Sequence, residues 1–306
     1  MPTIRLCADR KTIKEHESAP QQPLAHRTNF LETPSFRNRR TTFGENAAAY
    51  QEARPPYPAV VYDHLRACIP FAGARIFEIG PGTGQATRIL LDHQPEELTA
   101  IEPDPRLCAY LAEYLAPTAP HLTVIPASWE DAPIEAGTYD LGIAATAFHW
   151  LPQAEALRKV HRALKPGGWW AMWWNVFGDP NEPDAFHLKA SPLFAQLGES
   201  RSWQQGQLPF ALNRTARLDD LHAAGFQDVE AFFLRWNITM TTAQISALAA
   251  TFSQISAADP AVKTHILHEL AKLADQEFGG IVERRFMTAL YTARKPPRSS
   301  GALERR

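Results

Sequence analysis

Short apolar runs alternate with segments of helical pattern through the middle of the chain. The runs occupy residues 75–79, 98–101, 122–125, 139–145 and 169–175. Each has a length typical of a strand buried in a sheet. Between the first two runs, Ala86, Ile89 and Leu90 recur at the spacing of an amphipathic helix. This alternation predicts a mostly parallel sheet with helices packed on its faces.

The pattern changes beyond residue 176. Proline and glycine interrupt short helical pieces over residues 177–217, and a helix over 218–226 ends at Gly225. Two strand patterns at 227–237 and 283–294 enclose a mostly helical segment, 241–278. Such an insertion can fold over the carboxyl ends of the strands, where open parallel sheets bind ligands. We therefore expect both insertions to lie near a binding site.

A glycine-rich loop follows the first predicted strand directly. Residues 78–84 read Glu-Ile-Gly-Pro-Gly-Thr-Gly, with glycines at 80, 82 and 84. Glycine permits a sharp turn with positive φ and lets backbone N–H groups approach a ligand without an intervening Cβ. The dinucleotide pattern Gly-x-Gly-x-x-Gly requires its third glycine where this chain has Gln85. The loop therefore favours another nucleoside ligand, although a nicotinamide dinucleotide and a purely structural turn remain alternatives.

An acidic residue ends the second predicted strand. Glu102 follows Ile101, about 20 residues beyond the glycine loop. A carboxylate at the tip of the neighbouring parallel strand can accept hydrogen bonds from both ribose hydroxyls of an adenine nucleoside. We expect Glu102 to bind ribose; the alternative is a solvated loop acid.

Three further motifs occur at fixed separations from this loop. They are Phe-His-Trp at 148–150, Lys-Pro-Gly-Gly at 165–168, and an opening segment with Phe-Gly at 43–44, Ala-Tyr at 49–50 and Arg-Pro-Pro-Tyr-Pro at 54–58. Together with Glu-x-Gly-x-Gly-x-Gly, they resemble the class I S-adenosylmethionine-dependent methyltransferases. Over about residues 43–296 the chain is similar to the small-molecule type, as in trans-aconitate methyltransferase. The resemblance implies a seven-stranded, doubly wound Rossmann-like α/β sheet, mostly parallel with an antiparallel edge hairpin, and S-adenosyl-L-methionine as cofactor.

The resemblance also implies a set of cofactor-binding residues. They are Glu78, Gly80, Gly82, Gly84, Glu102, Ser128, Trp129 and Ala145. By position, Ser128 faces the exocyclic amine of adenine and the Trp129 amide faces a ring nitrogen. Family members often have Asp or Asn where this chain has Ser128, so the backbone contact at Trp129 is the firmer expectation. The alternative for Trp129 is a half-buried surface aromatic.

Candidate acceptor residues flank the same site. His149 lies just beyond the fourth strand and either removes a proton from a hydroxyl or amine acceptor, or holds a carboxylate acceptor together with Trp150. A merely structural histidine is the third possibility. Tyr50 and Arg54 lie four residues apart, where the family closes a lid over the cofactor. Arg54 is expected to meet a carboxylate of the cofactor or the acceptor, or else to form a surface ion pair.

Composition limits the remaining possibilities. The formal net charge of −2 predicts no standing attraction to nucleic acid. No apolar run reaches the length of a membrane span. Cys7, Cys68 and Cys108 form no close pair, so a reducing, cytoplasmic location is expected and a disulfide framework is not. The sequence leaves the acceptor and the oligomeric state undetermined.

The two ends of the chain and a tryptophan-rich strand receive structural interpretations. Residues 1–42 contain an excess of basic residues and are predicted to form a flexible arm. They lack the apolar stretch of a secretory signal. Residues 297–306 are predicted to form a flexible tail. The tryptophans of 169–174 are most simply core, because a central parallel strand is buried on both faces. His265, His268 and Glu269 are explained by one helix face, and no metal site is expected.

Three functions therefore stay open. The first is methyl transfer to a small-molecule acceptor, with oxygen or carboxylate favoured. The second is an NAD(P)-dependent oxidoreductase on a Rossmann sheet, and the third is a cofactor-binding interaction protein without catalysis. Gln85 and the Phe-His-Trp segment weigh against the second.

Overall fold

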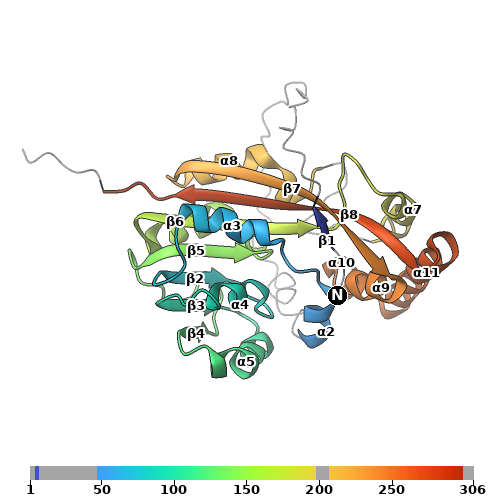
Figure 1. Ribbon diagram of the computed structural model, residues 1–306, viewed down its shortest axis with the longest axis horizontal. Helices are drawn as coiled ribbons and strands as arrows, with labels where there is room; N and C mark the ends of the chain where they lie inside the picture. The colour runs from blue at the N-terminus through green and yellow to red at the C-terminus, as the bar shows by residue number, and fades with distance from the viewer. Residues whose placement is uncertain (1–3, 7–46, 198–206, 299–306) are drawn as a thin grey trace, which may run out of the picture.

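A computed structural model describes residues 4–6, 47–197 and 207–298 (Figure 1). Over these residues, eight strands form one sheet in the order β1-β7-β8-β6-β5-β2-β3-β4. The strands are β1 (Ile4–Leu6), β2 (Arg75–Ile79), β3 (Glu97–Ile101), β4 (Leu122–Ile125), β5 (Tyr139–Ala145), β6 (Leu164–Val176), β7 (Gln227–Thr241) and β8 (Ile281–Arg294). Strands β2 to β6 pair in parallel, and β8 lies antiparallel between β6 and β7. The predicted mostly parallel sheet with an antiparallel edge hairpin is confirmed.

The edge beyond β7 carries a strand that the sequence did not predict. Residues 4–6, part of the predicted flexible arm, form β1 and pair antiparallel with 236–238 of β7. An edge strand offers unpaired backbone N–H and C=O groups, and these residues satisfy some of them. The flexible-arm interpretation is therefore wrong for 4–6. The rest of the arm and the end of the predicted tail lie outside the described residues.

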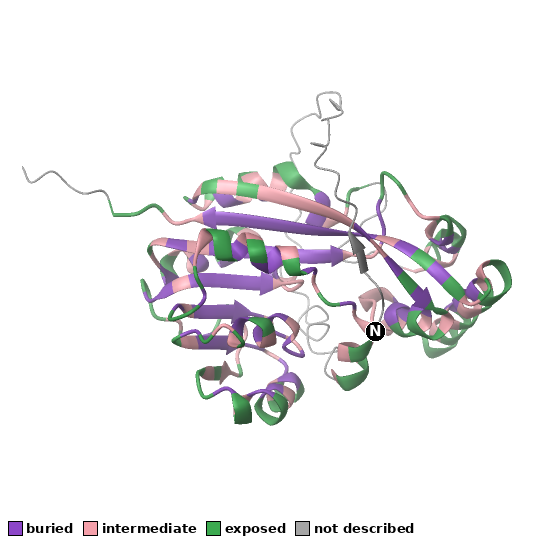
Figure 2. Ribbon diagram, in the orientation of Figure 1, coloured by how far each residue is buried: buried purple, intermediate pink, exposed green. Residues whose placement is uncertain are grey.

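Helices cover both faces of the sheet. They are α2 (Ala47–Ala53), α3 (Ala59–Cys68), α4 (Gln85–Leu91), α5 (Pro105–Tyr114), α6 (Gln153–Ala163), α7 (Ala185–Phe194), α8 (Arg214–Ala223), α9 (Thr242–Ala250), α10 (Ser253–Ser256) and α11 (Pro260–Phe278), with short 3-10 turns η2 (Ala116–Thr118), η3 (Phe148–Trp150) and η4 (Phe210–Leu212). Apolar residues of α3 and α4 pack in one core, and those of α6 and α8 in a core on the other face. Figure 2 shows the central strands buried and the outer helix faces exposed.

A third core forms where β7 and β8 extend past the rest of the sheet. It joins these strands to α7, α9 and α11, which lie together at one end of the molecule in Figure 1. The predicted helical segment 241–278 corresponds to α9, α10 and α11. In the other insertion, 177–217, α7 and η4 are described and residues 198–206 are not.

The Lys-Pro-Gly-Gly segment, 165–168, lies inside a strand, although its Pro-Gly-Gly sequence after a helix favours a tight turn. Helix α6 does stop at Ala163, but β6 begins at once with Leu164. Gly167 has a φ of +83°, and the register of β6 on β5 shifts beside it. Backbone bonds to Lys295 hold both glycines within the sheet. A glycine inside a strand absorbs such an irregularity without a Cβ clash.

Candidate active site

A cavity of about 760 Å³ opens at the carboxyl ends of the parallel strands. Its wall includes the glycine loop after β2, Glu102 after β3, residues 145–147 after β5 and the end of β6. The far side is formed by α7 and by residues 252–254 at the start of α10. This is the edge at which open parallel sheets bind ligands, and both insertions reach it.

The three loop glycines have different surroundings. Gly80, Gly82 and Gly84 adopt φ values of +63°, +60° and +81°, in the left-handed region. A Cβ on Gly80 would lie 2.6 Å from the Ala147 Cβ, and one on Gly84 would lie 2.6 Å from a Leu115 methyl. A Cβ on Gly82 would meet nothing within 4 Å, and Gly82 lines the cavity. The outer glycines permit close packing, whereas the middle one leaves its space to a ligand.

Glu102 is buried in the cavity wall beside this loop. Its Oε2 accepts the Gly82 N–H at 3.1 Å and its Oε1 accepts the Asp104 N–H at 3.0 Å. Burial raises the pKa of Glu102 to about 7, although both backbone N–H groups oppose that rise. Each carboxylate oxygen keeps capacity for a further donor. Hydrogen bonds from the hydroxyl groups of a bound ligand would favour the ionised form of Glu102.

Glu78 lies behind the loop and is not part of the cavity wall. It is fully buried at the end of β2, where its Oε2 accepts the Thr87 hydroxyl of α4 at 2.6 Å. Its Oε1 has no hydrogen-bond partner among the described residues. Burial raises the pKa of Glu78 to about 7, with Glu102 adding to the rise. Glu78 therefore ties α4 to β2, and its predicted cofactor contact stays a prediction.

Burial of Glu78 and Glu102 gives the protein a testable pH dependence. Each carboxyl has a folded pKa of about 7 against an ordinary 4.5, so the folded state holds these protons more tightly. This contribution to stability is present below pH 4.5 and is lost as pH rises through 7. We expect Glu78→Gln to gain stability over wild type as pH rises from about 5 to 8, by up to about 3 kcal/mol.

Denaturant unfolding at several pH values measures this difference. Glu96→Gln, on the exposed residue just before β3, is the matched control and should leave the pH dependence unchanged. A constant difference between Glu78→Gln and wild type across this range would contradict the buried, proton-binding state of Glu78.

Ser128 and Trp129 line the cavity after β4, but their side chains are engaged elsewhere. The Ser128 hydroxyl donates to Asp131 Oδ2 at 2.7 Å. The Trp129 ring stacks on Phe77 at 5.2 Å, and its indole N–H donates to the Ala156 carbonyl. Trp129 is 2% exposed, so the alternative of a half-buried surface aromatic is wrong. Their predicted contacts with adenine stay predictions.

The turn after β5 contains a strained residue. Ala145 lines the cavity as predicted for a cofactor residue, and Thr146 follows with a φ of +57°. The Thr146 hydroxyl lies 2.8 Å from that of the partly buried Tyr57, and the Thr146 N–H donates to the Trp173 carbonyl. Such strain persists where surrounding contacts fix it, and it is frequent at active sites. Sequence reasoning missed Tyr57 and Thr146, because only the fold brings them together.

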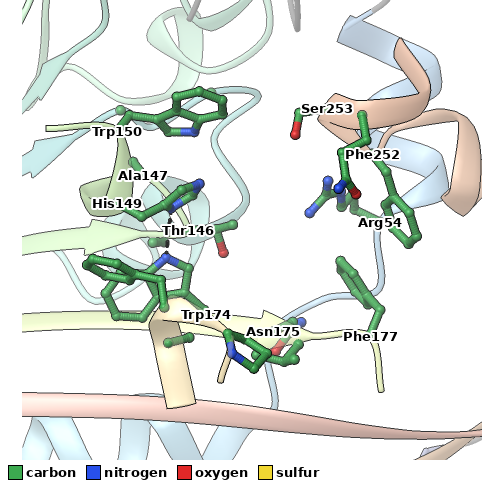
Figure 3. Close-up of a pocket in the computed structure, with 18 of the residues that line it drawn as sticks. Arg54, Thr146, Ala147, His149, Trp150, Trp174, Asn175, Phe177, Phe252 and Ser253 are labelled. Atoms are coloured by element: carbon green, nitrogen blue, oxygen red, sulfur yellow. Dashed lines mark hydrogen bonds between the residues drawn. The ribbon is translucent and has the colours of Figure 1, made fainter. Parts of the chain in front are cut away.

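His149 lies on η3, and its ring contacts the end of β6 (Figure 3). The Trp174 indole N–H donates to His149 Nδ1 at 3.0 Å. Trp170 and Trp173 are fully buried core residues, as the sequence predicts, but Trp174 lines the cavity. Trp174 is itself buried in the core, as predicted, and it lines the cavity in addition. His149 and its neighbour Trp150 both line the cavity.

Arg54 faces them across the cavity in Figure 3. Its Nε donates to the Thr251 hydroxyl at 2.9 Å and one Nη to the Thr251 carbonyl at 3.1 Å. The guanidinium lies over the rings of Tyr50, at 4.9 Å, and Phe177, at 5.0 Å. Within the described part of the chain, no carboxylate forms an ion pair with Arg54. Tyr50 and Arg54 therefore both reach the cavity, and the described residues contain no surface ion pair of Arg54.

Segment 50–54 also contacts the glycine loop. The Thr83 hydroxyl donates to the Gln51 side chain, and the Gln85 amide donates to the Arg54 carbonyl at 3.1 Å. Through Arg54 the same segment bonds to Thr251 at the end of α9. These contacts connect the loop with the helices of the far wall.

The far wall is largely aromatic. Its rings come from Phe177, Phe186, Phe194 and Phe252, whereas Phe210 lies on the opposite side against His149 and Trp174. Arg284 also lines this side, but Asp184 Oδ2 pairs with it at 3.0 Å. This end of the cavity therefore combines apolar walls with one cation, Arg54, that no described carboxylate neutralises.

Two absences hold for the described residues. No helix over 47–197 or 207–298 is long and apolar enough to cross a membrane. Over the same ranges, no three His, Cys, Asp or Glu side chains group as a metal site requires, and His265 and His268 lie on α11.

Comparison with known proteins agrees with this geometry. Residues 76–168 match a family described as a methyltransferase domain. They contain the glycine loop, Glu102, the Phe-His-Trp turn and the start of β6. Residues 76–168 therefore form a methyltransferase domain, and the fold and the site agree with the class I S-adenosylmethionine-dependent type.

Individual relatives match about half of the chain. An uncharacterized methyltransferase of Mycobacterium tuberculosis is 31% identical over 47% of this chain and 56% of its own length. A malonyl-[acyl-carrier protein] O-methyltransferase of Geobacter sulfurreducens is 29% identical over 52% of this chain and 58% of its own length. The chain thus spans little more than half the length of the curated relatives it matches.

Solved structures support the fold over a longer stretch. A protein of Anaeromyxobacter dehalogenans, provisionally named a type II methyltransferase, has a TM-score of 0.56 at 22% identity, over 80% of this chain and 99% of its own. Phosphoethanolamine N-methyltransferase 2 of Haemonchus contortus was solved with phosphomonomethylethanolamine and S-adenosylhomocysteine. It has a TM-score of 0.53 at 16% identity, over 85% of this chain and 59% of its own. The [4+2]-cyclase SpnF has a TM-score of 0.50 at 19% identity, over 78% of this chain and 80% of its own. At these identities the likeness concerns the fold alone.

Proposed function

We propose that this protein transfers the methyl group of S-adenosyl-L-methionine to an oxygen of a small-molecule acceptor, with a carboxylate favoured. The observation that carries the proposal is one continuous cavity with two chemically different ends. Gly82 and Glu102 form the end suited to a nucleoside, and His149 and Arg54 lie toward the other. A methyl donor and an acceptor can therefore meet in one cavity.

At the first end, the protein supplies hydrogen-bond acceptors and open backbone. Glu102 would hold the ribose hydroxyls, and the space beside Gly82 would admit the cofactor next to the loop. Adenine would lie against residues 128–129, and the methionine end would extend toward Ala145. The bound S-adenosylhomocysteine of the Haemonchus enzyme supports this choice of cofactor.

At the second end, little chemical assistance is required. The sulfonium methyl is already activated, so an in-line displacement depends mainly on placement and on exclusion of water. His149, Trp150 and Arg54 offer donors to an acceptor oxygen, while the aromatic wall fits an acceptor with an apolar part. The name of the Geobacter relative, an O-methyltransferase, supports oxygen as the nucleophile. Arg54 would hold a carboxylate of either the cofactor or the acceptor.

This proposal includes a domain assignment and a set of partners. Residues 43–296 would form one methyltransferase domain, with segments 177–217 and 241–278 covering the acceptor. The partner would be a small molecule and neither a nucleic acid nor a membrane, in keeping with the net charge of −2.

We expect isothermal calorimetry to detect binding of S-adenosylmethionine and of S-adenosylhomocysteine, but not of NAD. The physical reason is that the third loop glycine is Gly84, one residue earlier than the dinucleotide pattern requires. Incubation with methyl-labelled cofactor and a panel of carboxylic acids, alcohols and amines then identifies the acceptor. Binding of NAD without binding of the sulfonium cofactor would reject the proposal.

A second candidate function is cofactor binding without methyl transfer. The likeness to SpnF, a cyclase, is the specific observation in its favour, because the same fold there has a different named activity. Cofactor binding in calorimetry with no label transfer to any acceptor class would favour this second function.

A further inference from the structure

We propose that Trp174 is a positioning residue that fixes the tautomer of His149, so that His149 presents an Nε2–H donor to the acceptor. This inference rests on the proposed function and deepens it. It decides between the two roles that the sequence leaves open for His149, removal of a proton and positioning of an acceptor.

The donor in this contact is unambiguous. An indole nitrogen carries a hydrogen and has no acceptor lone pair, so Trp174 can only donate. The distance of 3.0 Å to His149 Nδ1 is that of an ordinary N–H···N bond. Nδ1 must therefore offer its lone pair.

The indole cannot easily turn away. Trp174 is 3% exposed and belongs to β6, a strand inside the sheet. Its ring packs edge-on against Phe210 at 5.4 Å and against Tyr291 at 6.3 Å. The Tyr291 hydroxyl is itself bonded to the Ala211 carbonyl. Neighbouring side chains from η4 and β8 thus hold the donor in one orientation.

The consequence concerns the other ring nitrogen. A neutral imidazole carries one hydrogen, so an unprotonated Nδ1 places it on Nε2. A second proton on Nδ1 would set two N–H groups against each other. Figure 3 shows the second nitrogen of His149 on the cavity side, away from the indole. His149 therefore meets the acceptor as a donor, without the lone pair that a general base needs.

This arrangement selects acceptors by their protonation state. A carboxylate arrives ionised and can accept the Nε2–H with one oxygen while the other attacks the methyl group. The methyl–sulfur bond breaks as the oxygen–carbon bond forms, and no proton has to move. An alcohol or ammonium acceptor would need a base that His149 does not provide. We therefore expect transfer to carboxylates and not to simple alcohols or amines.

The tautomer can be measured without any acceptor or cofactor. Nitrogen-15 NMR distinguishes the two tautomers and the imidazolium, and the His149 signal is the one missing from His149→Gln. We expect the Nε2–H tautomer at pH 8 in the full-length protein. An Nδ1–H tautomer or an imidazolium would overturn the proposal. Trp174→Phe, which removes the donor, should release the ring into a tautomer mixture. Trp169→Phe, at a partly buried position of the same strand and outside the cavity wall, is the control and should leave the His149 tautomer unchanged.

A pair of His149 variants tests the consequence for catalysis. The amide nitrogen of Gln reaches the position of Nε2, whereas that of Asn reaches the position of Nδ1. With a carboxylate acceptor from the labelled panel, His149→Gln should keep kcat within about tenfold of wild type, and His149→Asn should lose clearly more. A base would be lost in both variants, and kcat would fall by about 10²–10⁴-fold in each. Equal losses of that size would overturn the proposal.

The two hypotheses fail in different experiments. Absence of cofactor binding in calorimetry rejects the proposed function and leaves the tautomer measurement unaffected. Cofactor binding with the wrong tautomer rejects the role of Trp174 alone. If Trp174→Phe does not fold, the NMR spectrum of the wild-type protein and the kcat values of His149→Gln and His149→Asn still test the proposal.

Discussion

Glu102→Ala is expected to weaken binding of S-adenosylmethionine by about 1.5–3 kcal/mol, or about 10- to 150-fold. The carboxylate already accepts N–H groups of Gly82 and Asp104, so its loss removes the acceptor of the ribose hydroxyls and leaves both donors without a partner. The effect should appear in the affinity for cofactor and product alike, because both carry the same nucleoside. Calorimetry with each ligand measures it.

A conservative variant and a distant one sharpen this measurement. In Glu102→Gln the amide must turn its NH2 group toward one of the two backbone donors, so we expect a loss close to that of Glu102→Ala. Glu96→Ala, at the opposite and exposed end of the same strand, should bind normally. Unchanged affinity in a folded Glu102→Ala protein would remove Glu102 from the ribose site.

The parts of the fold that the sequence predicted are those with a local cause. The runs 122–125 and 139–145 were predicted with their observed bounds, because turn residues flank these short apolar runs. The glycine loop is equally local: Gly80, Gly82 and Gly84 each require positive φ, which few other residues adopt.

The parts that were missed depend on distant chain segments. Trp174 belongs to a strand whose composition indicates core, and only the position of η3 makes it a partner of His149. Thr251, 197 residues after Arg54 in the sequence, becomes its hydrogen-bond partner through the packing of α9. Strand β1 pairs only because β7 leaves an open edge. No periodicity within a single segment contains this information.

The two glycines Gly80 and Gly82 should separate stability from ligand binding. Alanine at either position pays about 1–2 kcal/mol for its positive φ. Gly80→Ala also drives its Cβ against Ala147, 2.6 Å away in the turn before His149, which adds about 1–3 kcal/mol of overpacking. We therefore expect Gly80→Ala to lower the free energy of unfolding by about 2–5 kcal/mol. Gly82→Ala should lower the free energy of unfolding only by the cost of its positive φ. It should also reduce cofactor affinity, because its Cβ enters the space left in the cavity wall.

Gly73→Ala measures the cost of a positive φ alone, without a clash. Gly73 has a φ of +70° and no atom within 4 Å of its added Cβ, and it lies outside the cavity wall. Denaturant unfolding should show Gly82→Ala and Gly73→Ala equally stable and both clearly more stable than Gly80→Ala, since of these three positions only Gly80 combines strain with a clash. Calorimetry should then separate Gly82→Ala from Gly73→Ala, because only the former meets the cofactor. If Gly82→Ala bound S-adenosylmethionine as tightly as Gly73→Ala does, the open space beside the loop would not be where the cofactor lies.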